Sequence, residues 1–197
     1  MKRKFDTKAI VTTGLLLALE IVFQVIGNYV QLGPVNINLS LVTIVLAAAL
    51  CGPLSGAIVG FFNGILALFS PSTLAIFMPI SPVGTVLACL LKCTIAGVLA
   101  GLVFNLLKKK NVIVGLIIAS LIVPIVNTGI FSIFCLIFFR PFLESYMSEA
   151  MPNIGAVLIF GIIGWNFIFE IISTPVLSTL VGTIILKKRA KQEQINA

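Results

Sequence analysis

The sequence contains no histidine, and only 10% of its 197 residues are charged. Soluble domains carry about 25% charged residues, so this chain cannot cover itself with a polar surface in water. Without histidine, the usual ligand sets of catalytic and structural zinc are missing. The four cysteines all lie in apolar runs, where we expect small buried hydrophobic side chains rather than metal ligands: Cys51, Cys89, Cys93 and Cys135. No metal site and no cofactor are therefore expected.

Two catalytic motifs are also missing from the sequence. No G-x-x-x-x-G-K-[ST] segment occurs, so the chain is not expected to bind ATP through a P-loop. No G-x-S-x-G segment occurs that would indicate a serine hydrolase. These absences disfavour an enzyme, although a membrane enzyme that uses Glu20, Lys92 or Glu170 as acid or base remains an alternative.

The chain is instead rich in apolar residues, with 59% hydrophobic residues and a mean hydropathy of +1.20. This composition predicts an integral membrane protein. The net charge of +7 comes with no aromatic residues interleaved among the basic ones, so nucleic-acid binding is not expected. The composition therefore favours a lipid bilayer as the surroundings of this chain.

Eleven of the thirteen basic residues form three clusters beside apolar runs, and these clusters predict the topology. They are Lys2, Arg3, Lys4 and Lys8; Lys108, Lys109 and Lys110; and Lys187, Lys188, Arg189 and Lys191. Basic clusters that flank hydrophobic spans stay on the cytoplasmic side. We therefore expect a multi-pass protein of the cell membrane with both termini and the central loop in the cytoplasm.

The apolar runs predict six transmembrane helices in one all-α domain over residues 1–197. The expected spans are Lys8–Gly27, Leu39–Cys51, Leu54–Phe69, Val83–Leu107, Val112–Phe139 and Ile154–Leu186. The second and third are shorter than the roughly 20 residues that a spanning helix needs. They either extend into the flanking loops or lie buried against neighbouring helices. Residues 28–38 are expected to form an outer loop or a short re-entrant segment, and residues 70–81 and 140–153 are expected to form outer loops.

Polar side chains recur inside these spans, where they are costly unless they face a cavity or a partner. They are Glu20 and Gln24 in the first span, Asn63 in the third, Lys92 in the fourth, Asn127 in the fifth, and Asn166 and Glu170 in the sixth. Together they predict a polar pocket that opens to the outside beneath the outer loops. The alternative is a set of structural hydrogen bonds between helices, including a buried Lys92–Glu170 pair.

Small residues form rows that allow helices to approach closely. One row lies on the third span at Gly52, Gly56, Gly60 and Gly64, and another on the fourth at Ala88, Lys92, Ala96 and Ala100. On the first span, Gly14 and Ala18 point about 120° away from Glu20 and Gln24. That helix should therefore turn one face to the pocket and offer a smooth face to a neighbour.

These features resemble the substrate-binding S component of an energy-coupling factor (ECF) vitamin transporter. The most specific stretch is CGPLSGAIVGFFNGILALF at residues 51–69, which is similar to the family's G-P-x-x-G-x-x-x-x-x-x-N-x-[LI] segment with Asn63 at the asparagine. The stretch PVGT at residues 82–85, followed by Lys92 and by Ala96-Gly97, is also similar. The resemblance implies capture of a vitamin outside the cell.

The resemblance also implies the partners: a transmembrane coupling subunit and two ATPase subunits that supply the energy. The family docks on the coupling subunit through A-x-x-x-A in the first helix. Gly14 and Ala18 match that spacing, with glycine in place of the first alanine.

Pantothenate is the vitamin that the polar residues favour, because an ammonium suits its carboxylate and amides suit its other groups. The expected substrate contacts are Asn63, Lys92, Asn127, Asn166, Gln24 and Glu20. Riboflavin, cobalamin and folate are the rival substrates. A facilitator that moves a small solute without partners is the rival function.

Overall fold

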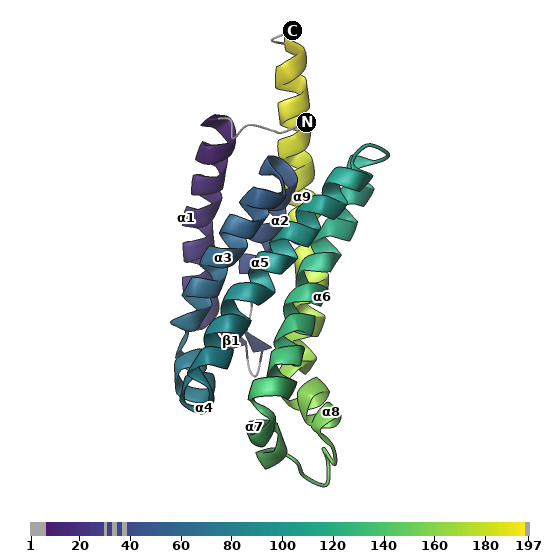
Figure 1. Ribbon diagram of the computed structural model, residues 1–197. Coiled ribbons are helices and arrows are strands. Elements are labelled where there is room, and N and C mark those ends of the chain that lie inside the picture. Colours follow the sequence, from purple (N-terminus) through teal and green to yellow (C-terminus); the bar gives the residue numbers. More distant parts are fainter. Residues whose placement is uncertain (1–6, 30, 33–34, 37–38, 196–197) are drawn as a thin grey trace.

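The computed structural model describes residues 7–29, 31–32, 35–36 and 39–195, most of which lie in helices. The longer helices run roughly side by side and form a bundle (Figure 1). They are α1 (Thr7–Tyr29), α2 (Ser40–Cys51), α3 (Pro53–Leu68), α5 (Pro82–Leu107), α6 (Val112–Phe138) and α9 (Gly164–Ile195). The shorter helical segments are η1 (Thr73–Phe77), α4 (Met78–Ile80), α7 (Arg140–Ser145), α8 (Ile154–Ala156) and η2 (Val157–Ile163).

Helices α3, α5 and α6 begin at a cap or a turn residue. The Ser81 side chain accepts a hydrogen bond from the Gly84 backbone N–H, directly before Pro82 at the start of α5. The Asn111 side chain accepts hydrogen bonds from backbone N–H groups in the first turn of α6. Between α2 and α3, Gly52 has a φ of 103°, a backbone conformation that favours glycine. The tight turn predicted at Gly52-Pro53 is therefore confirmed.

The short helix α2 occupies the centre of the bundle. Every residue from Ser40 to Leu50 is buried, and α1, α3, α5, α6 and α9 all pack against it. A helix that is apolar on all sides is stable only when other elements surround it. Of the two alternatives for the second expected span, the described residues adopt the short helix buried against its neighbours.

Backbone-to-backbone contact joins α3 to α5. A Cβ atom placed on Gly60 would lie 2.2 Å from the Cys93 carbonyl oxygen, and one on Gly64 would lie 2.4 Å from the Cys89 carbonyl oxygen. The glycine row predicted on this helix is thus confirmed as a surface for close approach. On α5, however, the residues that meet it are Cys89, Cys93, Gly97 and Gly101. The predicted row lies one position from these residues, and its alanines Ala88, Ala96 and Ala100 are buried.

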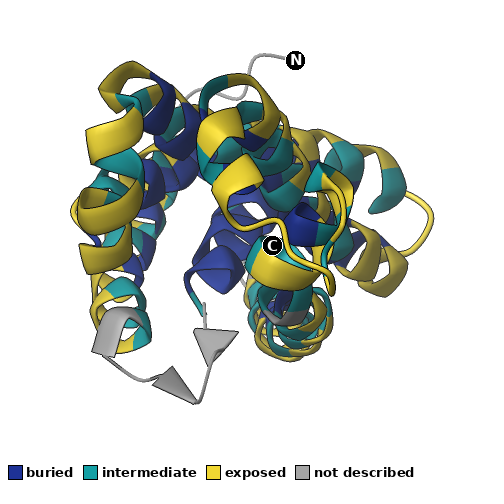
Figure 2. Ribbon diagram, turned by 90° about the horizontal axis from the view of Figure 1, so that it is seen from below, coloured by how far each residue is buried: buried dark blue, intermediate teal, exposed yellow. Residues whose placement is uncertain are grey.

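The outer surface of the bundle is apolar. Large hydrophobic side chains are exposed along α1, α5, α6 and α9, while buried residues face inward (Figure 2). Within the described residues, four helices are long and apolar enough to cross a membrane, or five if the pair α3 and η1–α4, bent by 65°, forms one span. The protein is thus an all-α membrane protein, and the count of six spans stays a prediction.

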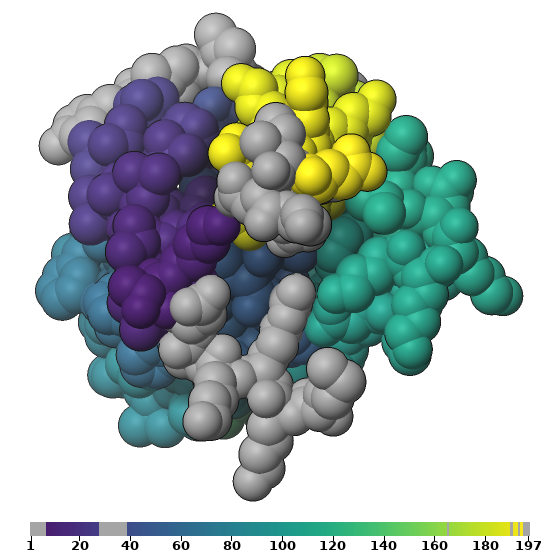
Figure 3. Space-filling view, turned by 90° about the horizontal axis from the view of Figure 1, so that it is seen from above, coloured from purple at the N-terminus to yellow at the C-terminus, as the bar shows by residue number. Residues whose placement is uncertain are grey.

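The basic clusters of the described residues lie at one end of the bundle. The start of α1 with Lys8, the Lys108–Lys110 loop and the end of α9 lie together there (Figures 1 and 3). The expected cluster at Lys2, Arg3 and Lys4 lies outside the described residues. Shared placement at one end is what the charge pattern requires if these segments face the same side of a membrane.

The opposite end is more structured than the sequence predicted. The first expected loop contains two paired strands, β1 (Gln31–Leu32) and β2 (Val35–Asn36), next to positions outside the described residues. Residues 70–81 contain η1 and α4, and residues 140–153 contain α7 and a bridge between Ser148 and Met151. The sequence did not predict these short elements within the expected outer segments. The expected sixth span at Ile154–Leu186 is divided among α8, η2 and α9.

Replacing Gly60 with valine should destabilise the protein strongly. The added atoms would overlap the α5 backbone at Cys93, and overpacking of this kind costs about 1–3 kcal/mol. Thermal unfolding in detergent should show a midpoint lowered by several degrees. Gly129→Ala is the matched control, because a Cβ there meets no atom within 4 Å. Equal midpoints for the two variants would contradict the close contact of α3 with α5.

Candidate substrate-binding site

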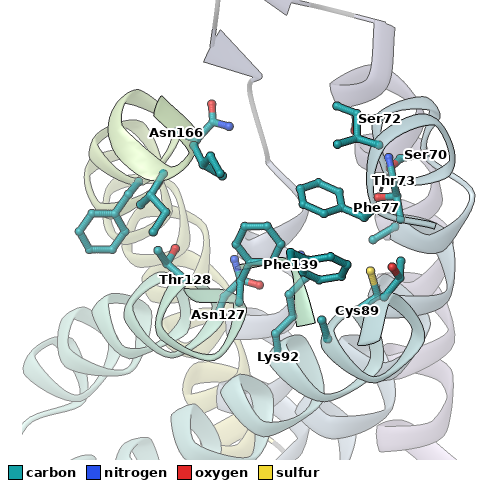
Figure 4. Close-up of a pocket in the computed structure, with 18 of the residues that line it drawn as sticks. Ser70, Ser72, Thr73, Phe77, Cys89, Lys92, Asn127, Thr128, Phe139 and Asn166 are labelled. Atoms are coloured by element: carbon teal, nitrogen blue, oxygen red, sulfur yellow. Dashed lines mark hydrogen bonds between the residues drawn. The ribbon is translucent and has the colours of Figure 1, made fainter. Parts of the chain in front are cut away.

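A cavity of about 480 Å³ lies in the half of the bundle away from the basic end. Side chains from α1, α3, η1, α5, α6, α7, η2 and α9 line it. Lys92 from α5 and Asn127 from α6 point into it, with Phe77 and Asn166 on opposite sides (Figure 4). Cavities of this size bind small organic molecules in other proteins.

Most of the residues that the sequence singled out meet at this cavity. Its lining includes Gln24, Asn63, Lys92, Asn127, Asn166 and Glu170, which come from five helices. Glu20 is not part of the lining: its side chain is fully buried one helical turn before Gln24. The structure therefore assembles one polar chamber from residues that are far apart in the sequence, while their contact with a substrate stays a prediction.

The Lys92 ammonium faces an aromatic ring rather than a carboxylate. Its Nζ lies 5.2 Å from the centre of the Phe131 ring, within the range of a cation–π interaction. Among the described residues, no carboxylate lies within salt-bridge distance of it. Neither Glu20 nor Glu170 therefore neutralises Lys92 by direct contact. An ammonium inside a membrane costs about 3 kcal/mol, which an anionic ligand would offset.

Glu20 takes part in a separate polar cluster beneath the cavity. Its carboxylate hydrogen bonds with Thr43 of α2 and accepts a hydrogen bond from Asn63 Nδ2 of α3 at 2.5 Å. The Ser40 hydroxyl, at the start of α2, also hydrogen bonds with the carboxylate and accepts from Asn63 Nδ2 at 2.7 Å. This cluster ties α1, α2 and α3 together directly behind the cavity wall.

Asn63 and Asn127 share one thiol. The Cys93 Sγ lies 2.9 Å from Asn63 Oδ1 and 3.2 Å from Asn127 Oδ1, so its single hydrogen is shared between the two amides. Cys93 is almost completely buried and lines the cavity between them. The thiol is therefore a hydrogen-bond donor within reach of both amide oxygens.

An aromatic wall covers the cavity on the side of the short helices, and the sequence analysis did not identify it. The Phe77 ring on η1 makes edge contacts with Phe131, Phe139 and Phe142, at centroid distances of 5.6, 5.1 and 5.9 Å. Tyr146 packs on Phe142 at 4.8 Å. Three of these residues are spaced three and then four positions apart, as on one face of a helix: Phe139, Phe142 and Tyr146. This spacing is the sequence pattern that could have predicted part of the wall.

The fold and the cavity define a class: a polytopic membrane protein with a polar cavity among its helices. The comparison with protein families gives the particular assignment. Residues 8–184 match the ECF transporter, substrate-specific component family, and the chain belongs to that family. It is thus a substrate-specific subunit of an ECF transporter, and this class is a transport component rather than an enzyme. Neither the curated proteins nor the solved structures contain a match to the chain.

Proposed function

We propose that this subunit captures pantothenate from outside the cell and delivers it through ATP-driven partner subunits. The observation that carries the choice of substrate is the Lys92 ammonium in the cavity, with no carboxylate of the described residues at salt-bridge distance. A substrate carboxylate there would form a charge-assisted hydrogen bond with Lys92.

The rest of the cavity suits a short chain with both apolar and hydrogen-bonding parts. Its wall carries amides from α3, α6 and α9 beside the aromatic side chains described above. Pantothenate joins a carboxylate, an amide and two hydroxyls to a dimethyl-substituted carbon, which the rings can cover. Riboflavin has no anionic group for Lys92, and cobalamin is far larger than a cavity of about 480 Å³. Folate, which carries two carboxylates, is the strongest rival.

The proposed orientation follows from the positions of the cavity and of the basic residues. With the basic end in the cytoplasm, the cavity lies in the outer half of the membrane, where a nutrient arrives. This orientation requires six spans within one domain in the cell membrane, with the buried helix α2 as one of them. The broken segments η1, α4 and α7 would then cover the cavity on the outside.

The proposed docking surface is the outer face of α1. Gly14 and Ala18 are exposed, and a Cβ on Gly14 would meet no atom within 4 Å. The opposite face of the helix is buried at Thr13, Leu16 and Glu20. An exposed row of small residues lets another helix approach closely, which suits the coupling subunit as the partner. Together with the two ATPase subunits, this partner would drive transport.

Replacing Lys92 with methionine should abolish the preference for the carboxylate. Wild type should bind pantothenate at least tenfold more tightly than pantothenol, in which an alcohol replaces the carboxylate, because a charged hydrogen bond is worth about 1.5–3 kcal/mol. The variant should bind the two compounds equally. Isothermal titration calorimetry on purified protein measures both affinities.

Lys110→Met, in the loop at the basic end, is the matched control and should bind as wild type does. If Lys92→Met keeps the full affinity for pantothenate, Lys92 is not a substrate contact. Mass spectrometry of the small molecule retained on purification provides an independent check, and a mass other than that of pantothenate would reject this vitamin.

Replacing Gly14 with tryptophan should stop transport while leaving substrate binding unchanged. The indole would fill the smooth face of α1 and keep the coupling subunit at a distance. Uptake of labelled pantothenate into proteoliposomes that hold the subunit, the coupling subunit and both ATPases measures the effect. Gly129→Trp adds the same bulk at another exposed, open position, on α6, and should transport normally.

Uptake by this chain alone, without ATP and without partners, would instead favour the facilitator. Normal transport by Gly14→Trp would show that docking uses a different face.

A further inference from the structure

The hydrogen bonds of Asn63 are nearly all made within the protein. Its amide nitrogen carries two hydrogens, and these point to Glu20 Oε1 at 2.5 Å and to Ser40 Oγ at 2.7 Å. Its amide oxygen accepts from the Cys93 thiol at 2.9 Å. An amide oxygen has two lone pairs, so one remains. Toward the cavity that it lines, Asn63 can therefore only accept a hydrogen bond.

Glu20 is the group that imposes this orientation. Glu20 Oε1 faces the amide as a hydrogen-bond acceptor, so the amide turns its NH₂ group toward it. The reversed amide would place Oδ1 against the Glu20 oxygen, and repulsion between two buried acceptors is costly in surroundings of low polarity. Glu20 is itself held by its hydrogen bonds with Thr43 and Ser40. The orientation is thus built into the contact of α1 with α2.

Asn127 has the opposite polarity. Its oxygen faces the Cys93 thiol at 3.2 Å, and its NH₂ group makes no hydrogen bond within the described residues. The amide nitrogen is therefore able to donate to a ligand, as is the Lys92 ammonium one residue before Cys93 along α5. The cavity floor consequently presents an acceptor on the α3 side and donors on the α5–α6 side.

We propose that Glu20 is a positioning residue for substrate selection: it orients Asn63 so that this part of the cavity accepts only a substrate that carries an O–H or N–H donor there. The inference rests on the proposed role of the cavity as the substrate site. It assigns Glu20 no contact with substrate, in contrast to the expectation from the sequence. A hydroxyl or the amide N–H of pantothenate would supply the donor.

Two substitutions separate orientation from mere packing. Glu20→Gln keeps an oxygen that can face the Asn63 NH₂ group, and its own NH₂ group can face Thr43. Glu20→Met has a similar length but offers no acceptor, so only Ser40 Oγ still favours the observed orientation and the amide can reverse. The glutamine variant should therefore behave as wild type in both measurements below, and the methionine variant should not.

The first measurement needs no ligand. Infrared spectroscopy resolves the S–H stretch of a buried thiol, and its frequency rises when the hydrogen bond weakens. The Cys93 band is identified by its loss in Cys93→Ala. In wild type and Glu20→Gln it should have the low frequency of a hydrogen-bonded thiol. In Glu20→Met it should shift upward, because the reversed amide no longer accepts from the thiol and only Asn127 Oδ1, at the longer distance of 3.2 Å, remains as an acceptor. An unshifted band in Glu20→Met would overturn the proposal.

The second measurement uses pantothenate and three analogues that each lack one donor: two in which fluorine replaces a hydroxyl, and one that is methylated on the amide nitrogen. Wild type should bind at least one analogue tenfold or more weakly than pantothenate, since an unpaired buried acceptor is penalised. Glu20→Met should reduce that ratio to less than threefold and still prefer pantothenate to pantothenol through Lys92. Full selectivity in Glu20→Met, or lost selectivity in Glu20→Gln, would overturn the proposal.

The outcomes also separate this inference from the proposed function. If wild type binds no pantothenate, the choice of vitamin fails, while the thiol band still tests the orientation of Asn63. If Glu20→Met does not fold, Ser40→Ala replaces it. That variant removes the other acceptor of the Asn63 NH₂ group and should shift the band and the selectivity in the same direction by a smaller amount. No change in Ser40→Ala would then count against the proposal.

Discussion

The contact between the backbones of α3 and α5 is the constraint on which the site depends. At Gly60 and Gly64 the two helices are so close that no side chain fits between them. This contact brings Asn63, which lies between those glycines in sequence, to the Cys93 thiol. Because α3 and α5 cannot separate without losing that packing, the amide and the thiol are held in place before any substrate arrives. A site that is organised in advance loses less entropy on binding.

The polar residues fall into two groups with different roles. Lys92 and Asn127 project into the cavity from α5 and α6, where a ligand can reach them. Glu20, Ser40 and Thr43 are completely buried and bind one another and Asn63. Buried polar groups are stable only when their hydrogen bonds are made, and here the partners come from different helices. The same bonds that satisfy the buried carboxyl group therefore also shape the cavity wall.

Helix α1 connects the outer surface of the bundle with the buried polar cluster and the cavity. Its exposed face carries Gly14 and Ala18, and its buried face carries Glu20 at the inner cluster and Gln24 at the cavity. Further bonds hold the basic end of the helix, where Thr13 donates to Ser55 at 3.1 Å and Arg189 donates to Thr12 at 3.0 Å. One helix thus carries both the proposed docking surface and residues beside and behind the cavity wall.

Much of this arrangement could be read from the order of the residues. The apolar runs predicted a helical membrane protein. Lys92, Asn63 and Asn127 were singled out because they are isolated polar residues within those runs. A membrane penalises such side chains unless they face a cavity or a partner. The turn at Gly52 and the glycine row of α3 were also predicted correctly. The family resemblance, suggested by the stretch around Asn63, is confirmed.

Other features depend on packing between distant segments. The aromatic wall around Phe77 requires a π-helical segment after α3 to meet the end of α6, and no local pattern predicts that meeting. The sequence did not predict which row of α5 meets α3, because two adjacent rows contain small residues and only the neighbouring helix distinguishes them. Sequence alone thus determined which residues are too polar for lipid. The tertiary structure decided that Lys92 and Asn127 face the cavity while Glu20 lies behind it, because only the packing of α1, α2 and α3 supplies Glu20 with hydrogen-bond partners.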